Sequence, residues 1–356
     1  MVRDNVTGLT WESKYHNRDR LIFEQNYDDP HDADNQYTWY DSGNPSNPGD
    51  LGDGKNTQNF LATLNQGFGG HTDWRLPTIK ELFYLVDLSI PQGSNYYRTD
   101  YRYFPHRHYS TPFDYWSSTI PLHPTLTTFG DALTMNWTGP YIVTRKMSNP
   151  YYAMAVRGDP EPESADRFLS HGNGTVTDKY TGLMWQRTTS QSGLNWEQAL
   201  RYSKDLTLGG YTDWRLPNIK ELLSLVDFFR INPAIDTDFF DDPASSGTRF
   251  FWSSTTTFLA NWAYGINFLN GSFSSEKKTF SSIQLYVRAV RTVQGAIPGD
   301  INGDEAVNLA DAVLCLIALV GLSGSDLSIK ADVDGDGKIG LPEAIFVLRS
   351  IAGMRD

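Results

Sequence analysis

The sequence predicts an α+β protein that consists of two copies of one loop-rich domain and a small all-α module. Three observations support this prediction: sequence blocks recur in the same order, each copy combines a short helix with short strands and long loops, and an acidic segment of different composition follows. We place the first copy at residues 1–158, the second at 167–293 and the module at 299–356, joined by linkers at 159–166 and 294–298.

Length, charge and cysteine content exclude several classes of protein. The chain has 356 residues. A single hydrophobic core does not usually organise a chain of this length, so we expect more than one domain. Its formal net charge of −12 argues against binding to nucleic acid through a basic surface, and its single cysteine, Cys315, excludes a disulfide framework. No apolar run reaches the roughly 20 residues of a membrane-spanning helix, so we expect no span. No signal peptide begins the chain; we expect that one has been trimmed, because the first copy lacks residues that precede the second.

The duplication is visible as an eleven-residue block, Thr72–Leu82, which recurs as Thr212–Leu222 with one difference between Thr78 and Asn218. Three further blocks recur in the same order, and their matched residues are Trp11 and Trp185, Trp116 and Trp252, and Arg157 and Arg291. The first copy also carries an insertion of about 34 residues, which we place at about 15–58. Its Pro, Gly, Asn and Asp residues predict turns and loops.

The repeated block predicts a short helix in each copy, beginning just after Pro77 or Pro217. Thr78 and Asn218 are suitable capping residues for it. One apolar face is expected from the i, i+3, i+4, i+7 spacing of Ile79, Leu82, Phe83 and Val86. An earlier helix is predicted in the second copy at 196–206. Short strands are predicted at 115–118, 133–137, 263–269 and 286–293.

The ordered blocks Gly-Leu-x-Trp, Thr-Asp-Trp-Arg-Leu-Pro-x-Ile-Lys-Glu-Leu, Trp-Ser-Ser-Thr and Val-Arg resemble the bacterial DUF1566 family, which is also known from the C-terminal domain of the collagen-like adhesin Lcl. The blocks are also similar to formylglycine-generating enzymes, and this resemblance implies a C-type-lectin-like fold for both copies. Neither copy contains the cysteines that the chemistry of those enzymes needs. The calcium-binding tripeptides of sugar-binding lectins are absent as well, so we expect no calcium-bridged sugar site in the copies.

The acidic segment 299–356 has ten acids and four bases, a net charge of −6. Two twelve-residue stretches within it carry oxygen-bearing residues at alternating positions, the pattern of loops that supply six to eight oxygens to calcium. Such carboxylates would repel one another without a cation. We predict two Ca²⁺ ions, with side-chain ligands and the backbone carbonyls of Ala306 and Lys338; the predicted ligands are Asp300, Asn302, Asp304, Ala306 and Asp311 in the first loop and Asp332, Asp334, Asp336, Lys338 and Glu343 in the second. The alternative is a solvated acidic loop.

Each loop leads into an apolar helix, predicted at 309–320 and 341–351. Tandem loop–helix units of this EF-hand-like kind resemble type I dockerin modules, and the resemblance implies a cohesin-like or other docking protein as partner. The Ser-Thr pair often found at loop positions 10 and 11 of that family is replaced here by Leu309-Ala310 and Leu341-Pro342, which puts the usual cohesin binding in doubt. Calcium loops of this kind suit millimolar extracellular calcium, so we expect a secreted or cell-surface protein.

Aromatic and basic residues alternate between positions 96 and 109 of the first copy. Tyr offers a rigid face with a polar tip, and Arg pairs bidentately with sulfate or carboxylate groups, so the pattern favours an anionic glycan. The alternative is that these rings pack a long loop. The candidate ligand-binding residues are Tyr96, Tyr97, Arg98, Tyr101, Arg102, Tyr103, His106, Arg107 and His108, with a second aromatic cluster at Tyr37, Trp39 and Tyr40.

The Trp, Arg and carboxylate residues of the two long repeated blocks are interpreted as structural, because both copies keep them while their loops differ. The sequence contains no Gly-x-Ser-x-Gly, phosphate-binding loop or His-Glu-x-x-His motif, so we assign no catalytic residue and expect no enzyme.

Together these patterns favour a secreted or cell-surface binding or adhesion protein that recognises a glycan or protein surface and carries a calcium-dependent docking module. Two alternatives stay open. The chain could be a self-assembling structural subunit of an extracellular filament or surface layer, or an accessory component of a polysaccharide-degrading complex.

Overall fold

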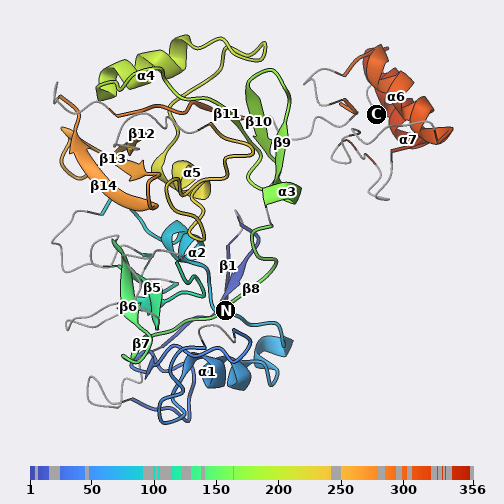
Figure 1. The fold of residues 1–356 in the computed structure, drawn as a ribbon. Coiled ribbons are helices and arrows are strands. Elements are labelled where there is room, and N and C mark those ends of the chain that lie inside the picture. The colour runs from blue at the N-terminus through green and yellow to red at the C-terminus, as the bar shows by residue number, and fades with distance from the viewer. Residues whose placement is uncertain are drawn as a thin grey trace. The chain divides into compact units, whose positions relative to one another are not determined.

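The computed structural model describes most of the chain, and all structural statements below concern these residues: 1–4, 7–15, 25–44, 48–90, 99–100, 103–104, 114–121, 130–137, 141–162, 164–241, 250–279, 285–293, 299–302, 307–321, 327, 331, 333 and 339–352. The architecture is mixed α/β, with several small sheets and few helices (Figure 1). The chain divides into two compact units, which are Met1–Val176 with Trp185–Arg291, and Thr177–Met184 with Thr292–Asp356.

The first copy contains two sheets and two short α-helices. One sheet has the strand order β1-β2-β8 and the other β3-β7-β4-β5-β6. Antiparallel pairing of β5 with β6 places Thr134 opposite Val143. The elements are β1 (Val2–Arg3), β2 (Thr10–Trp11), β3 (Gln36–Tyr37), α1 (Thr57–Leu64), the 3₁₀ turn η1 (Phe68–Gly70), α2 (Ile79–Tyr84), β4 (Asp114–Trp116), β5 (Asp131–Asn136), β6 (Tyr141–Lys146), β7 (Tyr151–Tyr152) and β8 (Val156–Arg157).

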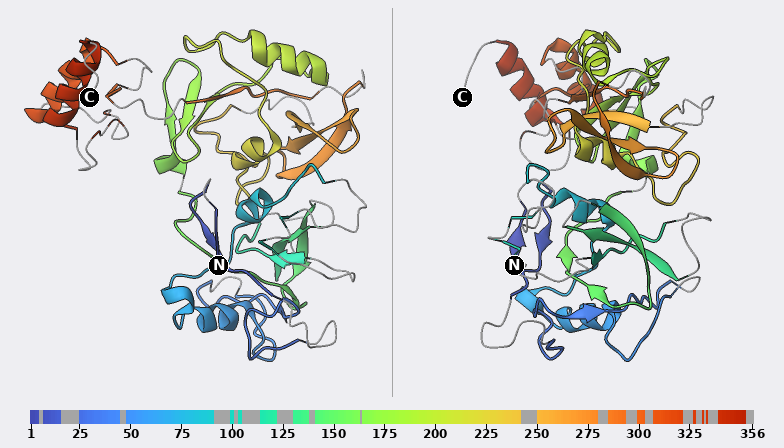
Figure 2. Two further views of the ribbon diagram at one scale, coloured as in Figure 1. Left: turned by 180° about the vertical axis from the view of Figure 1, so that it is seen from behind. Right: turned by 90° about the vertical axis from the view of Figure 1, so that its left-hand side faces the viewer.

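The second copy also contains two sheets and short helices, but its strands are distributed differently between the two sheets (Figure 2). Its sheets have the orders β15-β11-β10-β9 and β12-β13-β14. The elements are α3 (Ser164–Arg167), β9 (Phe168–Ser170), β10 (Thr175–Asp178), β11 (Leu183–Gln186), α4 (Trp196–Asp205), α5 (Ile219–Ser224), β12 (Phe250–Thr256), β13 (Trp262–Asn267), β14 (Ser272–Lys277) and β15 (Val290–Thr292).

The C-terminal segment contains α6 (Leu309–Leu319) and α7 (Leu341–Ile351), the two helices expected from the sequence. Cys315 is buried there with Ile301, Ala331 and Ala344. Burial raises the pKa of its thiol to about 11, so Cys315 serves as a small core residue rather than a reactive group.

The predicted helices of the repeated block are confirmed as α2 and α5, and the earlier helix as α4. Both α2 and α5 are six residues long and depend on their caps. The Thr78 hydroxyl accepts from the Glu81 amide, while the Glu81 carboxylate accepts from the Thr78 amide at 2.7 Å. Asn218 and Glu221 form the same capping box in α5. Such reciprocal bonds satisfy amides that a short helix leaves unpaired.

A buried tryptophan pair organises the core of each copy in the same way. In the first copy, Trp116 Nε1 donates to the carbonyl of Tyr37 at 2.7 Å, and Trp39 Nε1 donates to the carbonyl of Ser117 at 2.9 Å. In the second copy, Trp252 donates to Leu194 at 2.8 Å and Trp196 to Ser253 at 2.9 Å. Residues 37–39 of the first copy are therefore structurally equivalent to residues 194–196 of the second copy.

This equivalence indicates that the insertion in the first copy is not continuous. Tyr37 and Leu194 lie 157 positions apart, midway between the separation of 174 for Trp11 and Trp185 and that of 140 for the long repeated block. The extra residues therefore form two stretches of about 17 residues each, one before and one after residues 37–39, rather than one continuous insertion at about 15–58. The sequence alone concealed this because the residues at 37–39 share only the tryptophan with those at 194–196.

Candidate functional site

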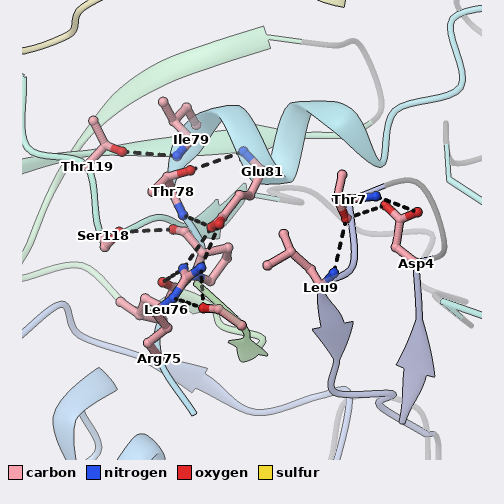
Figure 3. Close-up of polar contacts among 12 residues, drawn as sticks. Asp4, Thr7, Leu9, Arg75, Leu76, Thr78, Ile79, Glu81, Ser118 and Thr119 are labelled. Atoms are coloured by element: carbon pink, nitrogen blue, oxygen red, sulfur yellow. Dashed lines mark hydrogen bonds and ion pairs between the residues drawn. The ribbon is translucent and has the colours of Figure 1, made fainter. Parts of the chain in front are cut away.

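An arginine–carboxylate network anchors the repeated block in each copy, and Figure 3 shows the network of the first copy. The backbone of Arg75 pairs with Val156, and its guanidinium donates to both carboxylate oxygens of Glu81 at 2.8 and 2.7 Å. Arg215 and Glu221 form the equivalent bidentate pair at 2.8 and 2.6 Å. Because the carboxylate also caps its helix, the network links the final strand to the helix start. The structural interpretation of these residues agrees with this geometry.

A second ion pair joins each repeated block to the last strand of its copy. Arg157 Nε donates to Asp73 at 2.9 Å, and Arg291 Nε donates to Asp213 at 2.7 Å. The hydrogen bond from Arg291 holds the pKa of Asp213 below its ordinary value of 3.8. Arg291 is buried, whereas more than half of the Asp213 side chain is exposed, so solvent screens the pair.

The Asp213 pair predicts a limited dependence of stability on pH. A carboxyl group whose pKa is lowered on folding contributes stability above its unfolded value, near 3.8, and loses it as the pH falls through the lower folded value. We expect Asp213→Asn to reduce the free energy of unfolding at neutral pH by about 0.5–1 kcal/mol and to cost progressively less below about pH 4. Urea titrations of both proteins at neutral and acid pH measure this difference. A difference that stays constant with pH contradicts the prediction.

The predicted ligand-binding residues differ in where they lie and in how exposed they are. Tyr96, Tyr97, Arg98, Tyr101, Arg102, His106, Arg107 and His108 lie outside the described residues. The side chain of Tyr103 is exposed, and its backbone carbonyl accepts from Ser13. Tyr37 and Trp39 are buried in the core of the first copy, and Tyr40 is half-buried. This placement assigns Tyr37 and Trp39 to packing, because a ligand has no access to their rings.

Two lysines from equivalent positions form a reciprocal contact between the copies. Lys80 Nζ on α2 donates to the carbonyl of Ser224 at the end of α5, at 2.9 Å. Lys220 Nζ on α5 donates to the carbonyl of Tyr84 at the end of α2, at 2.8 Å. Each residue of one bond lies 140 positions from its counterpart in the other, so the two helices meet with approximate two-fold symmetry (Figures 1 and 2).

We call this contact between α2 and α5 the seam, and an aromatic contact adds to it. The rings of Phe83 and Phe273 contact across it in an edge-to-face arrangement at 5.4 Å. Burial lowers the pKa of the Lys220 ammonium group. Sequence reasoning missed the seam. The only available signal was that both copies carry a lysine at the same helical position, which also suits a solvent-exposed helix face.

A cleft of about 610 Å³ opens beside the seam. Its lining combines charged and aromatic side chains from α2, the segment between the copies and the turn after α5. Lys80 forms an ion pair with Glu161 at 2.8 Å. Arg230 pairs with Asp227 at 3.0 Å and with Asp236 at 3.5 Å. The volume lies in the range of small-molecule sites.

The C-terminal loops are described only in part. Asp300, Asn302, Asp311 and Glu343 lie within the described residues, whereas Asp304, Ala306, Asp332, Asp334, Asp336 and Lys338 lie outside them. Among the described residues, no cluster of three potential metal ligands of the types His, Cys, Asp and Glu is present.

The two acids at loop position 12 occupy equivalent places. The Asp311 carboxylate accepts from the amides of Ile301 at 2.8 Å and Asn308 at 2.9 Å. The Glu343 carboxylate accepts from the amides of Val333 at 3.2 Å and Gly340 at 2.6 Å. In both loops positions 2 and 9 donate, and in the first loop the amide of Asn302 at position 3 also donates to Asp311 at 3.2 Å. Each carboxylate therefore ties the beginning of its loop to the helix start.

These two acids fit a calcium ion. Asp311 is 0% exposed and Glu343 1% exposed, and within the described part of the chain neither forms an ion pair with Lys or Arg. A buried carboxylate without a cationic partner is costly, and a hard cation that prefers oxygen ligands offsets that cost. The carboxylates would hold the ion at the closing position of each loop.

None of the helices in the described ranges is long and apolar enough to cross a membrane. Comparison with protein families matches residues 298–347 to the dockerin type I domain, a class of module that typically binds calcium and docks to cohesins. This match confirms the predicted dockerin resemblance. A search of curated proteins finds no match. The Lcl C-terminal domain matches twice, at residues 1–157 and 174–291, which confirms the predicted tandem repeat. Since these two matches span most of the sequence, the chain belongs to the Lcl C-terminal domain family.

Proposed function

We propose that the chain is a secreted or cell-surface binding protein without catalytic activity, in which the two copies recognise a glycan or protein surface and the dockerin module attaches the chain to a partner. The observation that carries this proposal is the presence of two Lcl C-terminal domains and a dockerin type I domain in one chain. Both are non-catalytic modules, and dockerins are extracellular. The small sheets and few helices of each copy are compatible with the C-type-lectin-like fold that we expect for them.

The docking half of the proposal is supported by apolar faces on α6 and α7. Both helices repeat one pattern of burial at a spacing of 32 residues, with small or apolar side chains facing the core and larger apolar side chains exposed. The exposed residues are Leu309, Val313, Leu316, Leu319 and Val320 from α6 and its C-cap, and Leu341, Ile345, Leu348 and Ile351 on α7. An apolar surface of this extent favours burial against another protein.

We infer that a cohesin-like partner covers this surface mainly through apolar contact. Leu309 and Leu341 stand at loop position 10, where many dockerins carry a hydroxyl group, and both side chains are exposed. Leucine cannot replace hydrogen bonds of a hydroxyl group, but it gains about 25 cal/mol for each Å² of apolar area buried. The partner should therefore differ in this region from cohesins that bind through hydrogen bonds.

The binding half is tested by probing an array of glycans and extracellular-matrix proteins with the full chain. We expect selective capture by anionic glycans, and loss of that capture when Arg98, Arg102 and Arg107 are all changed to Ala, because Arg pairs with sulfate and carboxylate groups. The matched control changes the exposed basic residues Lys179, Arg201 and Lys204 to Ala, which removes equal charge from the second copy.

Two outcomes contradict this part of the proposal. Equal loss of binding in both triple variants would show that net charge, rather than the predicted loop, governs capture. An empty array together with filaments visible by electron microscopy would favour the structural-subunit alternative.

A further inference from the structure

Two clefts flank the seam between α2 and α5, and they are built from equivalent residues. In one cleft of about 570 Å³, Lys220 meets the Leu85–Asp87 segment that follows α2. In the other, of about 610 Å³, Lys80 meets the Leu225–Asp227 segment that follows α5. Every member of one set lies 140 positions from its counterpart. The duplication therefore gives both clefts the same lysine and the same three-residue segment. Differences among the other lining residues indicate where the two clefts differ in what they can bind.

The sequences of the two copies differ at the three positions that follow these segments. The first copy has Leu-Ser-Ile at 88–90, whereas the second has Phe-Phe-Arg at 228–230. Phe228 is buried, but Phe229 is 62% exposed on the lining of the cleft. An isolated exposed ring needs no special explanation. Here the ring lies next to the charged side chain of Arg230 in a cleft of ligand size, whereas the described lining of the equivalent cleft has charged side chains but no aromatic ring.

The charges in the larger cleft are paired with one another. Arg230 lies between Asp227 and Asp236, and Lys80 pairs with Glu161. The lining contains three basic and four acidic side chains, so the cleft offers no strong attraction to an ion of either sign; these residues are Lys80, Arg167, Arg230, Glu161, Asp227, Asp236 and Asp238. Paired guanidinium and carboxylate groups still present donors and acceptors in fixed positions.

We propose that the cleft lined by Phe229 and Arg230 binds a neutral saccharide. A sugar ring has an apolar C–H face and a rim of hydroxyl groups. The exposed Phe229 ring suits the face, and the Arg230–Asp227 pair supplies donors and acceptors for the rim. A cleft of about 610 Å³ accommodates a short oligosaccharide. This site rests on the proposed binding function and adds to it a second ligand class at a different place.

The test uses the full chain and replaces residues of this cleft by those of its counterpart. Phe229→Ser and Arg230→Ile carry the side chains found at 89 and 90. The control is Phe258→Ser, which removes another exposed ring that does not line the cleft. The probes are neutral gluco-, manno-, galacto- and xylo-oligosaccharides, first on an array and then by titration calorimetry. A cooperative melting transition in each variant establishes that it is folded.

We expect the unmodified chain and Phe258→Ser to bind at least one of these neutral oligosaccharides. Phe229→Ser and Arg230→Ile should each weaken that binding about tenfold or more, since truncation of an aromatic or arginine anchor commonly has an effect of this size. Undiminished binding by Phe229→Ser overturns the inference, and so does the absence of any neutral ligand for the full chain. If anionic glycans bind through Arg98, Arg102 and Arg107 while neutral ones do not, the proposed function survives and only this second site fails.

Discussion

Chelation of calcium is expected to unfold residues 299–356 while the two copies stay folded. The closing carboxylates Asp311 and Glu343 are buried, and their oxygens bond to the loop amides. Without the cation, the alternating acids of each loop repel one another. A segment of 58 residues has a small core, so stability supplied by a ligand forms a large part of its total. At a calcium concentration 100 times the dissociation constant, that contribution is about 2.7 kcal/mol per ion.

Circular dichroism and limited proteolysis in chelator, followed by addition of calcium, measure this effect. We expect a loss of helix signal, rapid cleavage after about residue 293 and recovery when calcium is restored. Glu343→Gln should weaken calcium binding by about tenfold or more, because it removes a charged ligand from position 12.

The matched control for this experiment is Glu305→Gln, in the first loop. It removes a carboxylate from position 6, which supplies no predicted ligand. Calcium binding should therefore change little. If chelator leaves the helix signal and the protease pattern unchanged, the interpretation of these loops as calcium sites is wrong.

Replacing Glu81 by Ala is expected to destabilise the first copy by about 2–4 kcal/mol. The substitution removes the carboxylate half of the capping box, in which Glu81 accepts from the Thr78 amide, and a hydrogen bond of this kind contributes about 1 kcal/mol. It also leaves the guanidinium of Arg75 without its bidentate partner. Losing one partner of a fully buried pair costs about 3–5 kcal/mol, and the Arg75 side chain, which is 25% exposed, should lose less.

The control is Glu197→Ala on α4, whose carboxylate pairs with Arg201 where both side chains are more than 70% exposed. Such surface pairs contribute about 0.5 kcal/mol or less. Glu81→Gln should fall between the two, because an amide oxygen can still cap the helix but the charge is lost. Urea denaturation of the three variants gives the values. Equal costs for Glu81→Ala and Glu197→Ala would show that the network does not anchor the fold.

The local elements that the sequence predicted correctly are those encoded by neighbouring residues. The capping residues Thr78 and Asn218 and the apolar spacing after them were sufficient to place α2 and α5. The alternating acids and the apolar runs after them were sufficient to identify the dockerin module. Each of these signals depends on side chains within about one or two helical turns, where spacing along the chain translates directly into position in space.

The aromatic residues show where such reasoning fails. Tyr37 and Trp39 had the composition of a binding cluster, but their backbone and side chains bond to Trp116 and Ser117, about 80 positions away, and are buried. Burial of an aromatic side chain depends on which distant segment covers it. Its identity alone does not distinguish a core ring from a ligand-binding ring.

The sequence by itself determined the duplicated domain, its short capped helices, the acidic dockerin module and its position-12 carboxylates, because repetition, helix caps and loop spacing are local properties of the chain. Only the tertiary structure decided that Tyr37 and Trp39 belong to the core, that Lys80 and Lys220 join the two copies reciprocally, and that Phe229 faces a cleft. These features arise from contacts between segments separated by up to 144 positions. Packing brings such segments together, and no spacing within a single motif encodes it.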